Sequence, residues 1–168
     1  WIHNGFVTIN KEKMSKSLKN FITIPDLLES YDANTIRFFI LTNHYRMPVE
    51  FSDESLTSAG SGARRLYNAV NEARKTVKID ESLDIKEFDE YKSFTEAMDD
   101  DLNTSKALAV LFDLANKTNK EQTSKNLTLL VKLADVLGFD FSRVELSENE
   151  LKDKIMPVVQ EVGIDIAT

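Results

Sequence analysis

The chain has 168 residues, no cysteine and a formal net charge of −7 at pH 7. Its apolar content of 42% and charged content of 29% are typical of a soluble globular chain that can bury a core. This composition excludes disulfides, thiolate catalysis and thiolate metal sites within these residues. With no membrane-length apolar run and no secretory pattern, we expect a cytoplasmic protein without a membrane partner.

Charge is unevenly distributed along the chain. Residues 1–50 hold 6 Lys and Arg against 5 Asp and Glu, whereas residues 51–168 hold 15 against 23. Broad, non-specific binding of nucleic acid depends on neutralising phosphates, so the acidic second part argues against it. Any RNA contact by that part should be limited and shape-dependent.

The first predicted element is a short hairpin over residues 6–12, followed by a lysine-rich loop. The loop reads Lys13-Met14-Ser15-Lys16-Ser17. Two ammonium groups can follow charge as it moves between phosphoryl oxygens, and small serines leave backbone N–H groups free to donate. The pattern therefore predicts a mobile gate over a polyphosphate, although a plain solvated loop has similar composition.

Two connecting helices are predicted next. Pro25 lies where the first begins, with Asp26 in its first turn. Asp32 is the predicted N-cap of the second helix, over about 33–43, which is apolar on nearly all sides and should be buried. Residues 47–52 are expected to be extended.

A long helix capped by Ser52 should begin a helical bundle. Its apolar residues recur at steps of three and four: Leu56, Ala59, Ala63, Leu66, Val70, Ala73 and Val77. Such a seam needs partner helices, so a bundle is expected. Gly60 and Gly62 either let another helix come close or mark a break.

Further helices are predicted around Phe88 to Met98, from Asn103 or Thr104, and over Leu127 to Leu137. The polar stretch from Lys117 to Lys125 should turn, and Gly138 should close the next helix. A capping box of Ser147 and Glu150 predicts a last helix that Pro157 ends or kinks.

Two polar segments of the sequence could have either a functional or a structural role. Adjacent carboxylates on a helix diverge, so Asp99-Asp100-Asp101 is a poor metal site, and we expect it to fix the start of the helix near Asn103. An RNA contact or a domain contact is the alternative. His44-Tyr45-Arg46 is expected to pack through hydrogen bonds. Trp1 is expected to lie in the core, and to be exposed only if the chain has been cut there.

These residues together resemble cysteinyl-tRNA synthetase, a class I aminoacyl-tRNA synthetase. The lysine loop matches the KMSKS signature of that class. The strings that carry the resemblance further are Trp1-Ile2-His3, Tyr31-Asp32-Ala33, Ile36-Arg37-Phe38-Phe39, His44-Tyr45-Arg46 and Met98 to Thr104. One departure is Lys19, where the family usually has Gly; it either bears backbone strain or adds a cation beside the nucleotide.

The resemblance implies ATP-dependent activation of cysteine to cysteinyl-adenylate and transfer to tRNA(Cys). It implies that Lys16 stabilises the departing pyrophosphate, with Lys13 assisting, and that magnesium-bound ATP lies at this loop. Met14 should seat the loop on apolar surface, while Ser15 and Ser17 shape it or donate weakly. No metal ligand is expected in the chain itself.

The family also has a nucleotide-binding half with a His-Ile-Gly-His-type motif and a zinc that grips the substrate thiol, and this sequence contains neither. We therefore expect a fragment that is inactive alone and monomeric, with zinc only in the N-terminal part that it lacks. The fold class implied is mainly α. A short hairpin and connecting helices from the end of a class I catalytic domain precede an anticodon-binding-like helical bundle.

The expected divisions are residues 1–50 for the KMSKS loop and connecting segment, 51–140 for the bundle, and 141–168 for a terminal helix and linker to a further domain. Two other functions stay open. One is a cysteine-activating ligase that acts on a small amine acceptor. The other is a non-catalytic helical interaction module in which the lysine loop is incidental. The Asp99 to Thr104 and His44 to Arg46 strings argue against a methionyl or arginyl synthetase.

Overall fold

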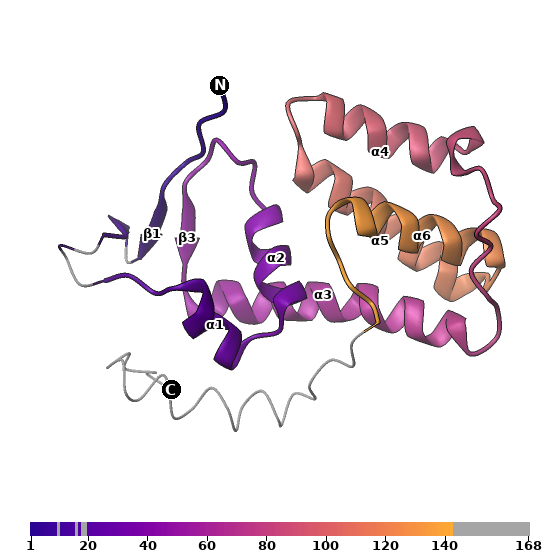
Figure 1. Ribbon diagram of the computed structural model, residues 1–168, viewed down its shortest axis with the longest axis horizontal. Coiled ribbons are helices and arrows are strands. Elements are labelled where there is room, and N and C mark those ends of the chain that lie inside the picture. Colours follow the sequence, from indigo (N-terminus) through magenta and orange to yellow (C-terminus); the bar gives the residue numbers. More distant parts are fainter. Residues whose placement is uncertain (10, 16, 18–19, 143–168) are drawn as a thin grey trace.

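The computed structural model describes residues 1–9, 11–15, 17 and 20–142. These residues form a mainly helical molecule with a small sheet at one end (Figure 1), which confirms the predicted fold class. The elements are β1 Val7–Ile9, β2 Glu12–Lys13, α1 Ile24–Ser30, α2 Ala33–Leu41, β3 Val49–Phe51, α3 Asp53–Arg74, the 3-10 helix η1 Ile85–Glu87, α4 Asp89–Asp99, α5 Thr104–Lys120 and α6 Ser124–Val136.

The sheet has the strand order β2-β1-β3. β1 and β2 form the predicted hairpin, in which Thr8 pairs with Lys13. β1 also pairs in parallel with β3, where Val7 lies opposite Val49 and Ile9 opposite Phe51. Residues 49–51 are extended as expected, but their pairing with β1 was not anticipated. The pairing anchors the base of the hairpin on the strand that leads into α3.

The two connecting helices begin where their capping residues predict. Thr23 caps α1 in a reciprocal capping box with Asp26, and proline occupies the first turn. The Asp32 carboxylate caps α2 by accepting from the backbone N–H groups of Asn34 and Thr35, at 2.8 and 3.1 Å. α2 ends at Leu41, two residues before the expected 43.

α3 runs from the sheet along the length of the molecule and beneath the bundle (Figure 1). It is continuous through both glycines, so neither marks a break. A Cβ built on Gly62 would lie 2.5 Å from the ring of Phe38 on α2, whereas one on Gly60 would lie 3.6 Å from Thr35. Gly62 therefore lets α2 pack closely against α3.

The core of the bundle lies between α3, α4, α5 and α6. Its fully buried leucines are Leu56, Leu66, Leu111, Leu114, Leu127, Leu129, Leu130 and Leu133. α5 continues to Lys120 through part of the stretch that we expected to turn. Lys117 and Lys120 lie in its last turn, where positive charge favours the helix dipole. Gly138 follows α6 with φ +79°, as predicted for a helix-terminating glycine.

Two expectations for the ends of the chain have different outcomes. Trp1 is fully exposed, which corrects its predicted place in the core. The helix predicted from Ser147 and Glu150 lies outside the described residues. Among the helices that the structure does describe, none combines the length and apolar character needed to cross a bilayer.

Candidate functional site

The lysine loop begins at the open end of the β1–β2 hairpin. Lys13 is the last residue of β2, and the backbone N–H of Met14 donates to the carbonyl oxygen of Val7 at 2.9 Å. The first two residues of the pentapeptide are therefore tied to the sheet. Met14 is half-buried.

Glu50 on β3 holds the turn of the hairpin. Its carboxylate accepts from the backbone N–H of Lys11 at 3.0 Å and also from the hydroxyl of Thr8. Lys11 has φ 63°, a left-handed conformation that the turn imposes on a non-glycine residue. Sequence reasoning missed Glu50, because its role depends on the β1–β3 pairing and has no local signal.

Asn20 closes the loop on its far side. Its side-chain oxygen accepts from the backbone N–H of Ser15 at 2.9 Å, and its amide nitrogen donates to the carbonyl oxygen of Lys13 at 3.4 Å. The hydroxyl groups of Ser15 and Ser17 lie 3.1 Å apart. An asparagine side chain can bridge backbone groups in this way because it both donates and accepts. The ability of asparagine to do both was the signal in the sequence for the role of Asn20. Sequence reasoning missed this role too.

The structure brings Lys13, Met14, Ser15 and Ser17 together around this closure. Lys13 is exposed, and its ammonium nitrogen lies 3.8 Å from the centre of the Phe6 ring. This cation–π contact holds the charge at the surface of the sheet. Lys16, like Lys19, lies outside the described residues. The arrangement offers an exposed cation, two hydroxyl groups and a backbone held from both sides.

The loop and the bundle contain no evident zinc site in the described part of the chain. No three His, Cys, Asp or Glu side chains there converge closely enough to hold a metal ion. The described residues therefore offer no ligand set for zinc, which the family resemblance implies only for a part of the protein outside this sequence.

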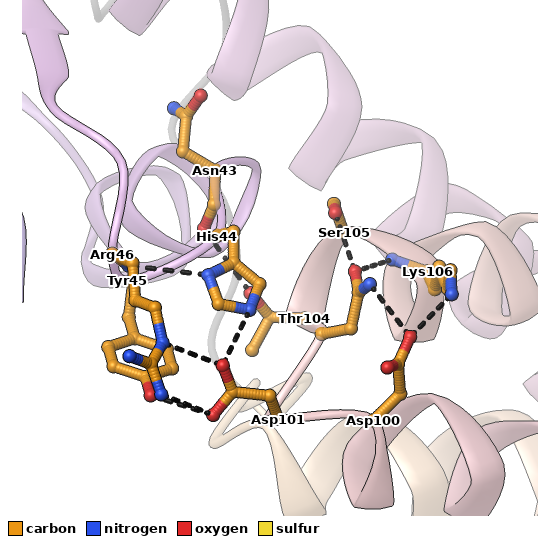
Figure 2. A network of polar contacts seen from close by, with 10 residues as sticks. Asn43, His44, Tyr45, Arg46, Asp100, Asp101, Thr104, Ser105 and Lys106 are labelled. Carbon is orange, nitrogen blue, oxygen red and sulfur yellow. Dashed lines mark hydrogen bonds and ion pairs between the residues drawn. The ribbon is translucent and has the colours of Figure 1, made fainter. Parts of the chain in front are cut away.

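Two residues of the acidic triplet, Asp100 and Asp101, have different partners. Asn103 is the N-cap of α5, as predicted, and Asp100 stays local by accepting from Asn103 and from the ammonium of Lys106. Asp101 instead reaches the segment after α2, as Figure 2 shows. Packing through hydrogen bonds at His44-Tyr45-Arg46 is thus confirmed, while the capping interpretation does not cover Asp101.

Comparison with known proteins gives the class. Residues 1–61 match the family described as tRNA synthetases class I (C) catalytic domain. Residues 93–142 match the DALR domain, and they cover most of α4 to α6. The two matches place the chain among the class I aminoacyl-tRNA synthetases.

The similar relatives narrow the class to one family. A cysteine–tRNA ligase of Geobacter sulfurreducens is 51% identical over 71% of this chain and 27% of its own length. Those of Laribacter hongkongensis and Shouchella clausii are 47% and 41% identical over 82% and 98% of this chain. The chain belongs to the cysteinyl-tRNA synthetase family. It spans only 27% to 38% of the length of these three relatives.

Proposed function

We propose that this chain supplies the ATP-closing loop and the tRNA-holding helices of a cysteine–tRNA ligase. The observation that carries the proposal is the exposed Lys13 on a loop closed by Asn20, in a chain closely similar to cysteine–tRNA ligases. The proposed substrates are cysteine, magnesium-bound ATP and the tRNA that accepts cysteine. The proposed state is a monomer in the cytoplasm.

In the first proposed step, a carboxylate oxygen of cysteine attacks the α-phosphorus of ATP. The bond to the bridging oxygen breaks, and pyrophosphate leaves with the negative charge that develops. Lys16 is assigned to the leaving phosphates, and Lys13 assists from the end of β2. In the second step a ribose hydroxyl at the 3′ end of the tRNA takes the cysteinyl group and releases AMP.

The geometry of the described loop residues supports these roles. A cation that stabilises a leaving group needs an approach from solvent, and Lys13 is exposed. The ammonium of Lys13 is held by the Phe6 ring only weakly, because surface cation–π contacts are weak. A polyphosphate can therefore displace it from the ring. Ser17 is also exposed, and Met14 is half-buried. ATP binding at this loop and the roles of its five residues are parts of the proposal.

The test replaces Lys16 by alanine in a polypeptide of the full length of the relatives. Cysteine-dependent ATP–pyrophosphate exchange should slow by roughly a hundred- to a thousandfold, the scale of losing one electrostatic stabiliser of a transition state. Lys11→Ala is the matched control, because Lys11 is exposed on the same hairpin but outside the pentapeptide. Unchanged exchange in the Lys16 variant would contradict the assignment.

The 168-residue chain alone should give no exchange, since it holds no cysteine-binding zinc set in its described part. Exchange above background by this chain would show that it carries a complete activation site. Replacing tRNA by a small amino-sugar acceptor separates the proposal from a ligase that acts on such an acceptor. A helical module without catalysis predicts no effect of ATP on the loop in the full-length protein.

A further inference from the structure

Residues 44–46 form a corner of the chain after α2. This corner is bonded to the turn between α4 and α5. The Asp101 carboxylate accepts two hydrogen bonds from the Arg46 guanidinium, at 2.7 and 3.1 Å. It also accepts one from the Tyr45 hydroxyl at 2.8 Å, and the His44 imidazole lies 3.6 Å away. Three consecutive residues of one segment therefore surround one carboxylate of another, as Figure 2 shows.

The turn that presents Asp101 has an uncommon backbone. Asp101 and Leu102 have φ values of 54° and 55°, and neither is a glycine. Two successive left-handed residues are unfavourable for L-amino acids, and leucine tolerates that conformation less well than aspartate. Hydrogen bonds from the N–H groups of Leu102 and Asn103 to the end of α4 hold the turn in place. This backbone turns the carboxylate toward the corner.

The corner is in turn bonded to the strand that carries the lysine loop. The carbonyl oxygen of Tyr45 accepts from the backbone N–H of Gly5 at 2.7 Å, two residues before β1. A Cβ on Gly5 would lie 2.2 Å from the carbonyl oxygen of Met47, so only glycine allows this approach. The carbonyl oxygen of Phe6 then accepts from the N–H of Val49 and starts the β1–β3 pairing.

We propose that Asp101 is a positioning residue that sets the lysine loop relative to the helical bundle. Tyr45 makes the connection, because its hydroxyl donates to Asp101 while its carbonyl oxygen accepts from Gly5. β1 begins two residues after Gly5 and pairs with β2, which ends at Lys13 in the loop. The catalytic consequence rests on the proposed function, whereas the structural consequence does not.

A second contact beside the first supports the assignment. The Thr104 hydroxyl, three residues after Asp101, donates to the carbonyl oxygen of Leu41 at 2.8 Å, at the end of α2. The α4–α5 turn thus contacts both the end of α2 and the corner that follows it. A shift of the turn would move both attachment points of the segment that leads to β3.

Asp99, in the same acidic triplet, provides a matched control for Asp101. Asp99 is exposed, and in the described part of the chain its side chain has no hydrogen bond or ion pair. Asp99→Asn removes a charge from the last residue of α4, and Asp101→Asn removes the same charge from the turn that follows. Asparagine also accepts the left-handed backbone of position 101, so the change removes the ion pair and leaves the turn intact.

The structural test is hydrogen–deuterium exchange of the full chain. Amides of residues 5–15 should exchange about two- to fivefold faster in Asp101→Asn than in Asp99→Asn, the scale expected for an exposed charge cluster. Amides of α5 and α6 should be unchanged in both variants. Equal exchange at residues 5–15 in the two variants would overturn the proposal, and loss of protection throughout α5 and α6 would show a general structural role instead.

The catalytic test uses the same pair of variants in the full-length protein. Asp101→Asn should raise the KM for ATP or lower the kcat of pyrophosphate exchange by about two- to fivefold at a temperature where the protein stays folded. Asp99→Asn should change neither. If Asp101→Asn changed only the thermal midpoint, Asp101 would be structural and the proposal wrong. If the unsubstituted protein gave no cysteine-dependent exchange, the proposed function would fail, while the exchange of amides 5–15 would still decide the role of Asp101.

Discussion

Eight leucines of the bundle are fully buried, whereas Lys13 and Ser17 at the other end of the molecule are exposed. Apolar burial stabilises the bundle, and specific hydrogen bonds from Glu50 and Asn20 shape the loop. A core of this kind tolerates little change in volume, while a loop of this kind can be reshaped by a ligand. Residues that matter for folding and residues proposed for chemistry are therefore largely different sets.

The substitution expected to have the largest effect is Leu130→Ala on α6, which tests whether folding residues and loop residues are separate. Leu130 is fully buried, so its truncation should lower the free energy of unfolding by about 2–5 kcal/mol. Denaturant unfolding measures the change. The hydrogen exchange of residues 5–15 should stay as in the unsubstituted chain under native conditions. A cost below that of a surface substitution would show that the α6 core is loosely packed.

A finer test compares the two glycines of α3. Gly62→Ala should lower the free energy of unfolding by about 1–3 kcal/mol, because its Cβ would overlap the ring of Phe38. Phe38 cannot move freely, since it packs against Phe112 and Phe139. Gly60→Ala should instead stabilise by about 0.5–1 kcal/mol, because it has room and alanine favours the helix.

Thermal or denaturant unfolding of the two glycine variants gives the comparison directly. Opposite signs would confirm that α2 approaches α3 more closely at Gly62 than at Gly60. Equal stabilisation by both alanines would place Phe38 elsewhere.

The smallest effect expected is the pH dependence of the corner at Asp101. The hydrogen bonds from Arg46 and then from Tyr45 lower the pKa of Asp101 from 3.8 to about 2. The hydrogen bond between Tyr45 and Asp101 also raises the pKa of Tyr45. A carboxylate with a lowered pKa in the folded state stabilises that state above its unfolded pKa, and the stabilisation is lost as pH falls through the folded value. The corner should therefore be intact at pH 4 and above and weaken toward pH 2.

A carbon-13 NMR titration of the side-chain carboxyl groups measures this shift. Asp101 should titrate near pH 2 in the unsubstituted chain. In Arg46→Gln its midpoint should move upward toward 3.8. A midpoint near 3.8 in both proteins would mean that the ion pair does not form in solution.

Local patterns predicted the helices well, because capping and seam residues act within a few positions. Asp32 and Ser52 cap the helices expected of them, and Gly138 ends α6. The parallel pairing of β1 with β3 could not be predicted, since three-residue strands with distant partners leave no periodic signal.

In the candidate site too, local patterns could be predicted and long-range contacts could not. The pentapeptide identified the loop, because its order is specific. Glu50 and Asn20 escaped notice, since they act through contacts that exist only after folding. Asp101 was seen as part of a string, yet its contact with Arg46 joins positions far apart in the chain. Sequence patterns thus identified the candidate loop but not the residues that hold it in place.

The parallel β1–β3 pairing also bears on how the chain assembles. The two strands are separated by roughly forty residues, and closing so long a loop costs entropy that two three-residue strands cannot repay by themselves. Docking of α2 on α3 shortens the part of that segment that stays open. We therefore expect β1 to pair with β3 only after α2 has docked on α3.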